Sequence, residues 1–156
     1  MMKLKLVGVE SVVAKFKGRS RAAPRVIEQA LTKFVIDLQR HVMEDKLSGQ
    51  VLNRVTGTLR RSITQRVERN ATWFLGIVGT NVEYARIHEY GGDVTVKAHL
   101  RTIKQAFGKP LKTPVTVNVQ EYVAHYPERS FLRSALKDMA PQLKGRMEAA
   151  LNEVAK

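Results

Sequence analysis

Histidines and acidic residues are the side chains of this sequence that could bind a metal ion or transfer a proton. The chain has no cysteine, and its histidines are His41, His88, His99 and His125. His88-Glu89 begins the helical pattern of zinc proteases, but position 92 is glycine where that pattern requires a second histidine. His41 has only acidic residues three and four positions later, a pairing typical of helix surfaces. We therefore expect no metal site and no cofactor.

Catalytic motifs built on glycine, serine or paired carboxylates are also missing. The segment Gly108–Pro110 shares only its Gly-Lys pair with a phosphate-binding loop, because proline lacks the backbone N–H that such a loop needs. No serine lies in a G-x-S-x-G nucleophile motif. Glu83, Glu89 and Asp93 are close in sequence, but they lie on a predicted short helix and its exit, where acids are common. The chain is therefore predicted not to be an enzyme.

The chain is strongly basic, and its charge is unevenly distributed. Lys and Arg number 27 against 14 Asp and Glu, which gives a net charge of +13 and a pI of about 10.3. Such a surface is either simply solvated or faces DNA or an acidic protein, and charge alone does not decide between these readings. The candidate assembly or DNA-facing residues are Arg60, Arg61, Lys97, Arg101, Lys104, Lys109, Lys112 and Arg129.

Length and composition are those of one soluble globular domain spanning residues 1–156, with 44% hydrophobic and 26% charged residues. No apolar run approaches the roughly 18 residues that would span a bilayer. The first nine residues alternate charged and apolar side chains, so they do not resemble a secretory signal. Neither the aromatic residues nor the helix spacing fits an RNA-recognition sheet or a helix-turn-helix. We expect no contact with a membrane.

Two long amphipathic helices are predicted. In the first, apolar residues recur every three or four positions from Pro24, which suits a first helical turn, to near Leu47, where Ser48-Gly49 ends the helix. The second helix follows Pro127, and Pro141 inside it predicts a kink or break. The apolar stripes of both helices predict the core residues Leu31, Phe34, Leu38, Phe131, Leu136 and Leu143.

Shorter elements are read from alternation and from turn residues. Strands are predicted at residues 3–9, 63–68, 72–78, 94–96 and 114–122, and short helices at 10–17 and 83–90. The second and third of these strands should form an antiparallel hairpin. Together they predict an α+β fold, in which a mostly antiparallel sheet of about four strands packs against a long N-terminal helix and a C-terminal helix.

A basic excursion at residues 97–112 interrupts this pattern. It is bounded by glycine and proline, and its lysines and arginines have no acidic neighbour, so it is hard to bury in a small domain. Residues 99–107 are predicted to form a helical turn, in which Ile103 and Phe107 lie four apart and form a small docking face. We therefore expect the excursion to serve assembly and not the core.

Four segments, in this order, resemble a known family. They are TGTLRRSI at Thr56–Ile63, VGTNVEYARIHEYGG at Val78–Gly92, the basic segment Leu100–Leu111 with the PVTVNV strand after it, and PERSFLRSAL at Pro127–Leu136. Their combination resembles the gene-ten-like and virion-morphogenesis family of siphophage and Mu-like phage tail-completion, or head–tail joining, proteins. The resemblance spans residue 56 to the C-terminus, and the long N-terminal helix lies in its expected place. The residues that the resemblance assigns to structural motif positions are Gly57, Gly79, Tyr84, Glu89, Gly91, Gly92, Pro127 and Phe131.

The resemblance implies a structural virion protein of a long-tailed bacteriophage, acting in tail completion and head–tail joining at the head-proximal end of the tail. It implies a ring-forming subunit, for which a hexamer is one option, located in the tail or neck of the virion and in the host cytoplasm during assembly. The expected partners are other neck and tail proteins: the tail terminator, tail tube, tape measure or head-closure protein, with packaged DNA as a further contact. The alternative is a cytoplasmic nucleic-acid-binding protein that uses its basic surface.

Overall fold

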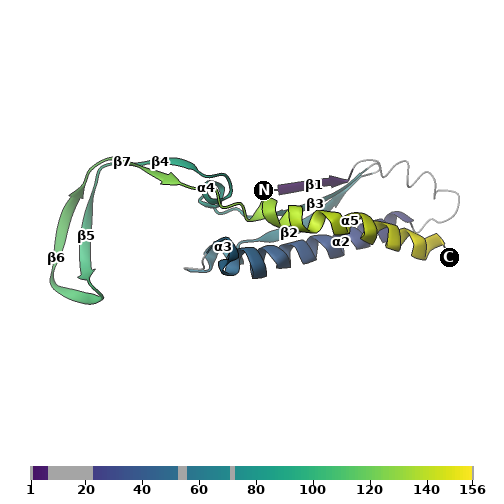
Figure 1. The fold of residues 1–156 in the computed structure, drawn as a ribbon, viewed down its shortest axis with the longest axis horizontal. Coiled ribbons are helices and arrows are strands. Elements are labelled where there is room, and N and C mark those ends of the chain that lie inside the picture. Colours follow the sequence, from purple (N-terminus) through teal and green to yellow (C-terminus); the bar gives the residue numbers. More distant parts are fainter. Residues whose placement is uncertain (1, 7–22, 53–55, 71–72, 156) are drawn as a thin grey trace.

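The computed structural model describes residues 2–6, 23–52, 56–70 and 73–155 (Figure 1). The short helix predicted at residues 10–17 lies outside them. In chain order the elements are β1 Met2–Leu6, α2 Ala23–His41, η1 Val42–Gln50, α3 Thr58–Arg61, β2 Thr64–Arg69, β3 Phe74–Gly79, α4 Ala85–Tyr90, β4 Gly92–Val96, β5 His99–Ala106, β6 Lys109–Val119, β7 Tyr122–Tyr126 and α5 Leu132–Ala155. The molecule is therefore α+β, with a long N-terminal and a long C-terminal helix, as predicted.

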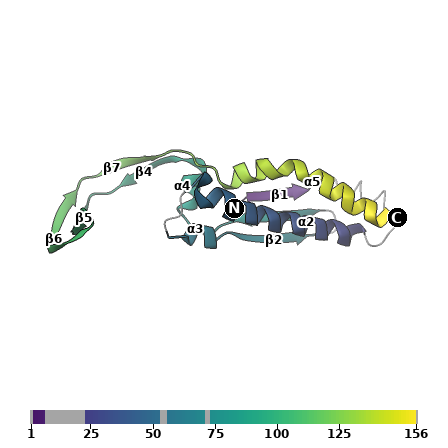
Figure 2. The ribbon, with the colours of Figure 1, turned by 60° about the horizontal axis from the view of Figure 1, so that its bottom comes forward.

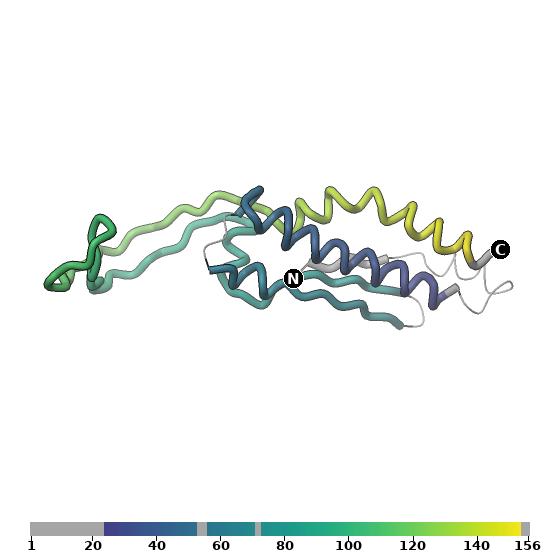
Figure 3. The backbone as a smooth tube through the Cα atoms, turned by 90° about the horizontal axis from the view of Figure 1, so that it is seen from below, coloured from purple at the N-terminus to yellow at the C-terminus, as the bar shows by residue number. Residues whose placement is uncertain are grey.

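The body of the molecule is a small antiparallel sheet combined with the two long helices. The predicted hairpin exists as β2 and β3, and β1 pairs with the other edge of β3, so the strand order is β1-β3-β2. Helix α2 contacts β2 and β3 and also packs along α5, as Figure 3 shows. Glycine permits this close packing, because a Cβ at Gly76 would lie 2.5 Å from Cγ2 of Val35.

The core lies between α2, the sheet and the first half of α5. Of the six predicted core residues, Leu31, Phe34, Leu38 and Phe131 are buried. Leu136 and Leu143 are partly buried and pack against this core. Helix α5 packs chiefly on one neighbour, α2, and a helix with one neighbour buries only a narrow line of side chains.

The predicted end of the N-terminal helix and the predicted kink or break in the C-terminal helix can both be compared with the structure. The N-terminal helix changes to a π-helical segment at Val42 and ends where Leu47 and Gly49 leave helical conformation, the latter with φ of 120°, which confirms the predicted end. Helix α5 runs unbroken through Pro141, so a break is not the outcome there. Proline has no N–H to donate to the carbonyl of Lys137, four residues earlier. Both residues are exposed, so this carbonyl can accept a hydrogen bond from water instead.

The sheet differs from the prediction in size. Among the described residues it has three strands and not about four, because the strands after α4 do not join it. They form two separate ribbons, β4 with β7 and β5 with β6. The predicted helical turn at 99–107 is also wrong. This segment is strand β5, because it pairs along its length with β6, and the pairing satisfies backbone groups that the sequence pattern does not reveal.

The two ribbons form a long arm, residues 92–126, which projects from one end of the body (Figures 1 and 2). We call the β4–β7 pair the proximal ribbon and the β5–β6 pair the distal ribbon. The arm bends where the proximal ribbon meets the distal one. The basic excursion predicted at 97–112 lies inside this arm, which extends further than that prediction on both sides.

Candidate assembly arm and its base

The arm leaves the body through a glycine pair at the end of α4. Gly91 and Gly92 have φ of 67° and 131°, a region that residues with a Cβ rarely adopt. A Cβ at Gly91 would also lie 2.8 Å from the backbone nitrogen of Glu128. The outgoing and returning strands therefore pass each other closely at this point, and glycine is needed there for both space and conformation.

Glu89, one of the motif residues, connects the base of the arm to helix α5. Its side chain is buried, and its carboxylate accepts hydrogen bonds from the backbone N–H groups of Phe131, Leu132 and Arg133 at 2.8, 2.9 and 2.9 Å. The hydroxyl of Ser130 donates a further bond at 3.1 Å. These N–H groups belong to the start of a helix and have no partner within it, so the carboxylate caps the helix and interacts favourably with its dipole.

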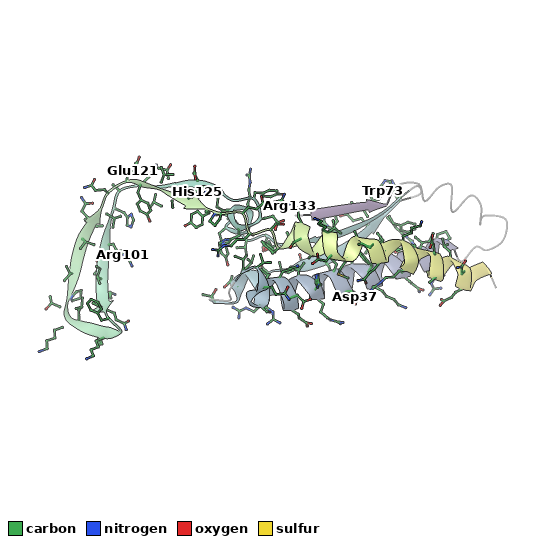
Figure 4. All side chains as sticks on the ribbon, in the orientation of Figure 1. Asp37, Trp73, Arg101, Glu121, His125 and Arg133 are labelled. Carbon is green, nitrogen blue, oxygen red and sulfur yellow. The ribbon has the colours of Figure 1, made fainter. Side chains whose placement is uncertain are left out.

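Arg133 completes this connection. Its Nε donates to the Glu89 carboxylate at 3.2 Å, and its Nη2 donates to the Glu89 carbonyl at 2.7 Å and to the Glu128 carboxylate at 2.9 Å. The guanidinium also stacks over the ring of Tyr90, 4.6 Å from its centroid. Figure 4 shows Arg133 at the junction between body and arm. No motif or periodicity in the sequence indicates this role of Arg133.

Aromatic rings add a second contact at the base. His88 packs edge-on against Tyr84 and against Tyr126, with centroid distances of 6.0 and 6.4 Å. Tyr126 is the last residue of β7, so this stack joins the returning strand of the arm to α4. Tyr84 is 45% exposed, whereas its neighbour Ala85 is buried.

The tip of the arm holds an aromatic residue in an unusual conformation. Phe107 and Gly108 connect β5 to β6 with φ of 48° and 76°, as in a type I′ turn between the paired Ala106 and Lys109. Asn and Gly are the usual residues there, and a phenylalanine with positive φ costs on the order of 1 kcal/mol or more. The Phe107 side chain is fully exposed, at 104%. The ring of Phe107 therefore contributes no buried surface to the fold.

The distal ribbon has two chemically different faces. Residues that pair directly across antiparallel strands share a face, and the pair Ile103 with Val115 therefore shares one with Arg101–Val117 and His99–Val119. We call this the valine face. The opposite face carries the pairs Leu100–Asn118 and Thr102–Thr116, and it is mainly polar. No other described element lies beside the distal ribbon in Figures 1 and 2, so neither face is covered.

The proximal ribbon repeats this division. Its pairs Val94–Ala124 and Val96–Tyr122 place apolar side chains on one face, and Asp93 and His125 pair on the other at 2.6 Å. Val94, Tyr122 and Tyr126 are among the exposed large hydrophobic residues of the chain. A two-stranded hairpin is marginal in water on its own. Among the described residues nothing covers the apolar faces of the arm, so these faces are exposed.

The structure divides the predicted basic residues between two places. Lys97, Arg101, Lys104, Lys109 and Lys112 all lie on the arm, and among the described residues none of them makes an ion pair (Figure 4). Arg60 and Arg129 line a cleft of about 460 Å³ on the body, together with Gly57, Tyr84 and His88. Arg61 lies near this cleft and donates to the carbonyl of Thr56. The body arginines and the arm tip are therefore separate sites.

The other motif residues have local structural roles. Gly57 has φ of 75° at the start of α3, and Gly79 ends β3. Thr80 then accepts a hydrogen bond from the N–H of Val82 at 3.1 Å, in the turn before α4, and no side chain of the described residues caps α4 itself. Pro127 lies between β7 and α5. These residues shape the backbone at the ends of helices and strands.

No site for a metal ion is found in the part of the chain that the structure describes, where no three His, Asp or Glu side chains gather suitably. His41 lies between Asp45 and Asp138, and Lys46 donates to Asp138 at 2.6 Å. Hydrogen bonds from Lys46 and then His41 lower the pKa of Asp138 below its ordinary value of 3.8. Among the described helices, none is long and apolar enough to cross a membrane.

Among the comparisons with known proteins, the one with family models gives a match. No curated protein and no solved structure gives a significant match to the chain. The model of the phage virion morphogenesis family matches residues 37–152, from the middle of α2 through the arm to near the end of α5. The match covers more than half of the chain and includes every motif segment described above. The chain therefore belongs to the phage virion morphogenesis family, and its role is a structural one in phage assembly.

Proposed function

We propose that the chain is a tail-completion subunit of a long-tailed bacteriophage, which assembles into a ring at the head-proximal end of the tail and joins the tail to the head. Membership of the virion morphogenesis family supports a structural role in the virion. The position in the tail and the ring are our proposal. The chain would act without catalysis, as a connector between other neck and tail proteins.

The uncovered arm is the observation that carries this proposal. Residues 92–126 stand away from the body with apolar faces exposed, including Val115 at 51% and Tyr122 at 51%. Exposed apolar surface of this extent is unfavourable in a monomer, and burial would contribute roughly 25 cal/mol per Å². The arm would contact a neighbouring virion protein, and other surfaces of the chain would form the ring, since head-to-tail contacts between copies close into a ring when the rotation between subunits allows it.

The basic surface favours a second candidate, a cytoplasmic nucleic-acid-binding protein. Its supporting observation is the run of five cations on the arm that form no ion pair with any described residue. This candidate requires that the isolated protein bind duplex DNA tightly and with a steep salt dependence. The tail-completion function requires instead that the protein be incorporated into particles and that DNA binding by the isolated chain be weak.

A complementation experiment tests the proposal. The gene is deleted from the phage that encodes it, and the protein is supplied from a plasmid either intact or with residues 97–121 replaced by Asn-Gly, which joins Val96 to Tyr122 through a two-residue turn. The intact protein should restore the titre. The shortened protein should yield filled heads and tails that fail to join or have unfinished ends. Normal particles from cells that lack the chain altogether would contradict the proposed function.

A further inference from the structure

We propose that the distal ribbon of the arm binds an apolar groove rimmed by carboxylates on a different virion protein, and not DNA or a second copy of this chain. The inference rests on the proposed function, since it assigns a partner chemistry to the arm. It is carried by three features of the ribbon: the valine face, the unpaired cations around it, and the strained aromatic residue at the tip.

The valine face defines the apolar part of the partner surface. Ile103, Val115, Val117 and Val119 lie together on one side of the ribbon, with Val115 51% exposed. Branched side chains on a pleated surface are stabilised mainly when they pack against another apolar layer. No described element of the chain supplies that layer. The partner must therefore provide an apolar strip.

The cations define the rim of that strip. Arg101 lies on the valine face itself, opposite Val117, and Lys104 lies where the strand register is irregular beside it. Lys109 and Lys112 follow on β6 near the tip. Between Asp93 and Glu121 the sequence has no acidic residue, so the ribbon cannot neutralise these charges itself. A partner that buries the valine face must offer carboxylates beside it, because desolvating unpaired cations is costly.

A second copy of this chain does not offer such a surface. Each copy carries a net charge of +13, so copies repel each other. Most acids in the described part of the chain are already engaged with Lys, Arg or His of the same molecule; they are Glu28, Asp37, Asp45, Glu68, Glu89, Asp93, Glu128, Asp138 and Glu148. We therefore infer that the acidic groove belongs to another protein. The ring would be formed by other surfaces of this chain.

DNA does not fit either, although it would neutralise the cations. A duplex presents phosphates and polar base edges, and it would leave the valine face unburied or place it against a polyanion. The tip adds to this argument. Phe107 keeps a fully exposed ring at a conformational cost in a turn where Asn or Gly would be unstrained. A ring held this way suits an anchor for an apolar pocket at the end of the groove.

Site-specific crosslinking tests the proposal in the assembled particle. Phe107 is replaced by the photoreactive p-benzoylphenylalanine, which keeps an aromatic ring at the tip, and completed phage particles are irradiated. We expect a crosslink to a different virion protein, in a segment that combines apolar residues with a net negative charge. A crosslink to a second copy of this chain, to DNA or to a basic segment overturns the inference, as does the absence of any protein crosslink.

Matched variants make the test specific. Reversing the charge of Lys104, Lys109 and Lys112 to Glu should lower the crosslink yield by about tenfold or more, whereas the same change at Lys33, Lys137 and Lys144, on the exposed surface of the body, should leave it within about twofold. Equal losses from both sets overturn the inference.

A second pair of variants tests the valine face. Val117→Thr removes apolar surface at nearly constant shape, and Thr116→Val adds it on the opposite face of the same strand. Only the first should reduce the crosslink, by about threefold or more. An equal response to both would overturn the role of the valine face. A crosslink to a second copy would leave the proposed function intact, whereas normal head–tail joining without the chain would overturn that function instead.

Discussion

Glu89 and Arg133 form an ion pair between the last turn of α4 and the first turn of α5, 44 residues apart in the sequence. The carboxylate is almost completely buried, and it also accepts three backbone hydrogen bonds from the start of α5. Because the whole arm lies between these two residues in the sequence, this pair fixes where both of its strands leave the body. The Glu89 carboxylate therefore contributes to the orientation of the arm, together with the aromatic contact of His88 with Tyr126.

Replacing Glu89 with Gln should lower the free energy of unfolding by about 3 kcal/mol. The amide cannot accept all of the N–H donors that the carboxylate accepts, and it leaves Arg133 without its buried partner. Urea denaturation followed by circular dichroism measures the change. Glu128→Gln is the control, since it removes the exposed partner of the same guanidinium and should cost less than about 1 kcal/mol. Equal stability of the two variants would contradict the role of Glu89.

Replacing Gly76 with Ala should destabilise the protein by about 1–3 kcal/mol, because the new methyl group would overlap Val35 on α2. The control is Gly145→Ala, in the exposed part of α5, where a Cβ meets nothing within 4 Å. That change should stabilise the protein by up to about 1 kcal/mol, since alanine favours a helix over glycine. Thermal unfolding of both proteins should therefore show shifts of opposite sign, and a neutral Gly76→Ala would mean that α2 does not pack this closely on β3.

Two phenylalanines should respond oppositely to truncation. Phe34 is fully buried in the core, and Phe34→Ala should cost about 3–5 kcal/mol. Phe107→Ala should change stability by less than about 0.5 kcal/mol, because the ring at the tip contacts nothing that it could stabilise. Chemical denaturation of each variant measures both values. A large loss for Phe107→Ala would show that the tip packs on the body.

The version of the chain with residues 97–121 replaced by Asn-Gly should melt within a few degrees of the intact protein. The distal ribbon contacts chiefly itself, β5 against β6, and the core residues all lie outside it. Differential scanning calorimetry provides the measurement. Loss of the cooperative transition would mean that the arm belongs to the folding unit of the body, and the failure of this variant in phage assembly would then have to be attributed to misfolding.

The lowered pKa of Asp138 predicts how the stability of the folded protein depends on pH. Its pKa is lower in the folded protein than the ordinary 3.8, first through Lys46 and then through His41. A lowered folded-state pKa contributes stability above pH 3.8, and this contribution disappears as the pH falls through the still lower folded pKa. The stability difference between the natural protein and Asp138→Asn should therefore be constant near pH 5 to 6 and shrink below pH 3.8. A difference that grows on acidification would contradict the assignment.

The sequence alone determined the elements whose signal is local. Apolar spacing predicted both long helices, the residues Leu31, Phe34, Leu38 and Phe131 as core, and the end of the first helix at Gly49. Alternation predicted the β2–β3 hairpin, and the motif order predicted the family. These features follow from periodicity and turn chemistry, which act over a few residues and can be read without knowing the neighbours.

Only the tertiary structure decided the conformation of the segment between Asp93 and Glu121, which has no acidic residue, and the way in which the arm is attached to the body. Ile103 and Phe107, four apart, fit a helical face equally well, and pairing of β5 with β6 is what makes the segment a ribbon. Glu89 looked like one acid among several on a short helix, because its donors at Phe131 and Arg133 lie more than 40 residues away. Backbone pairing and capping satisfy groups across long separations in the chain, so their partners are fixed by the fold and leave no periodic signal in the sequence.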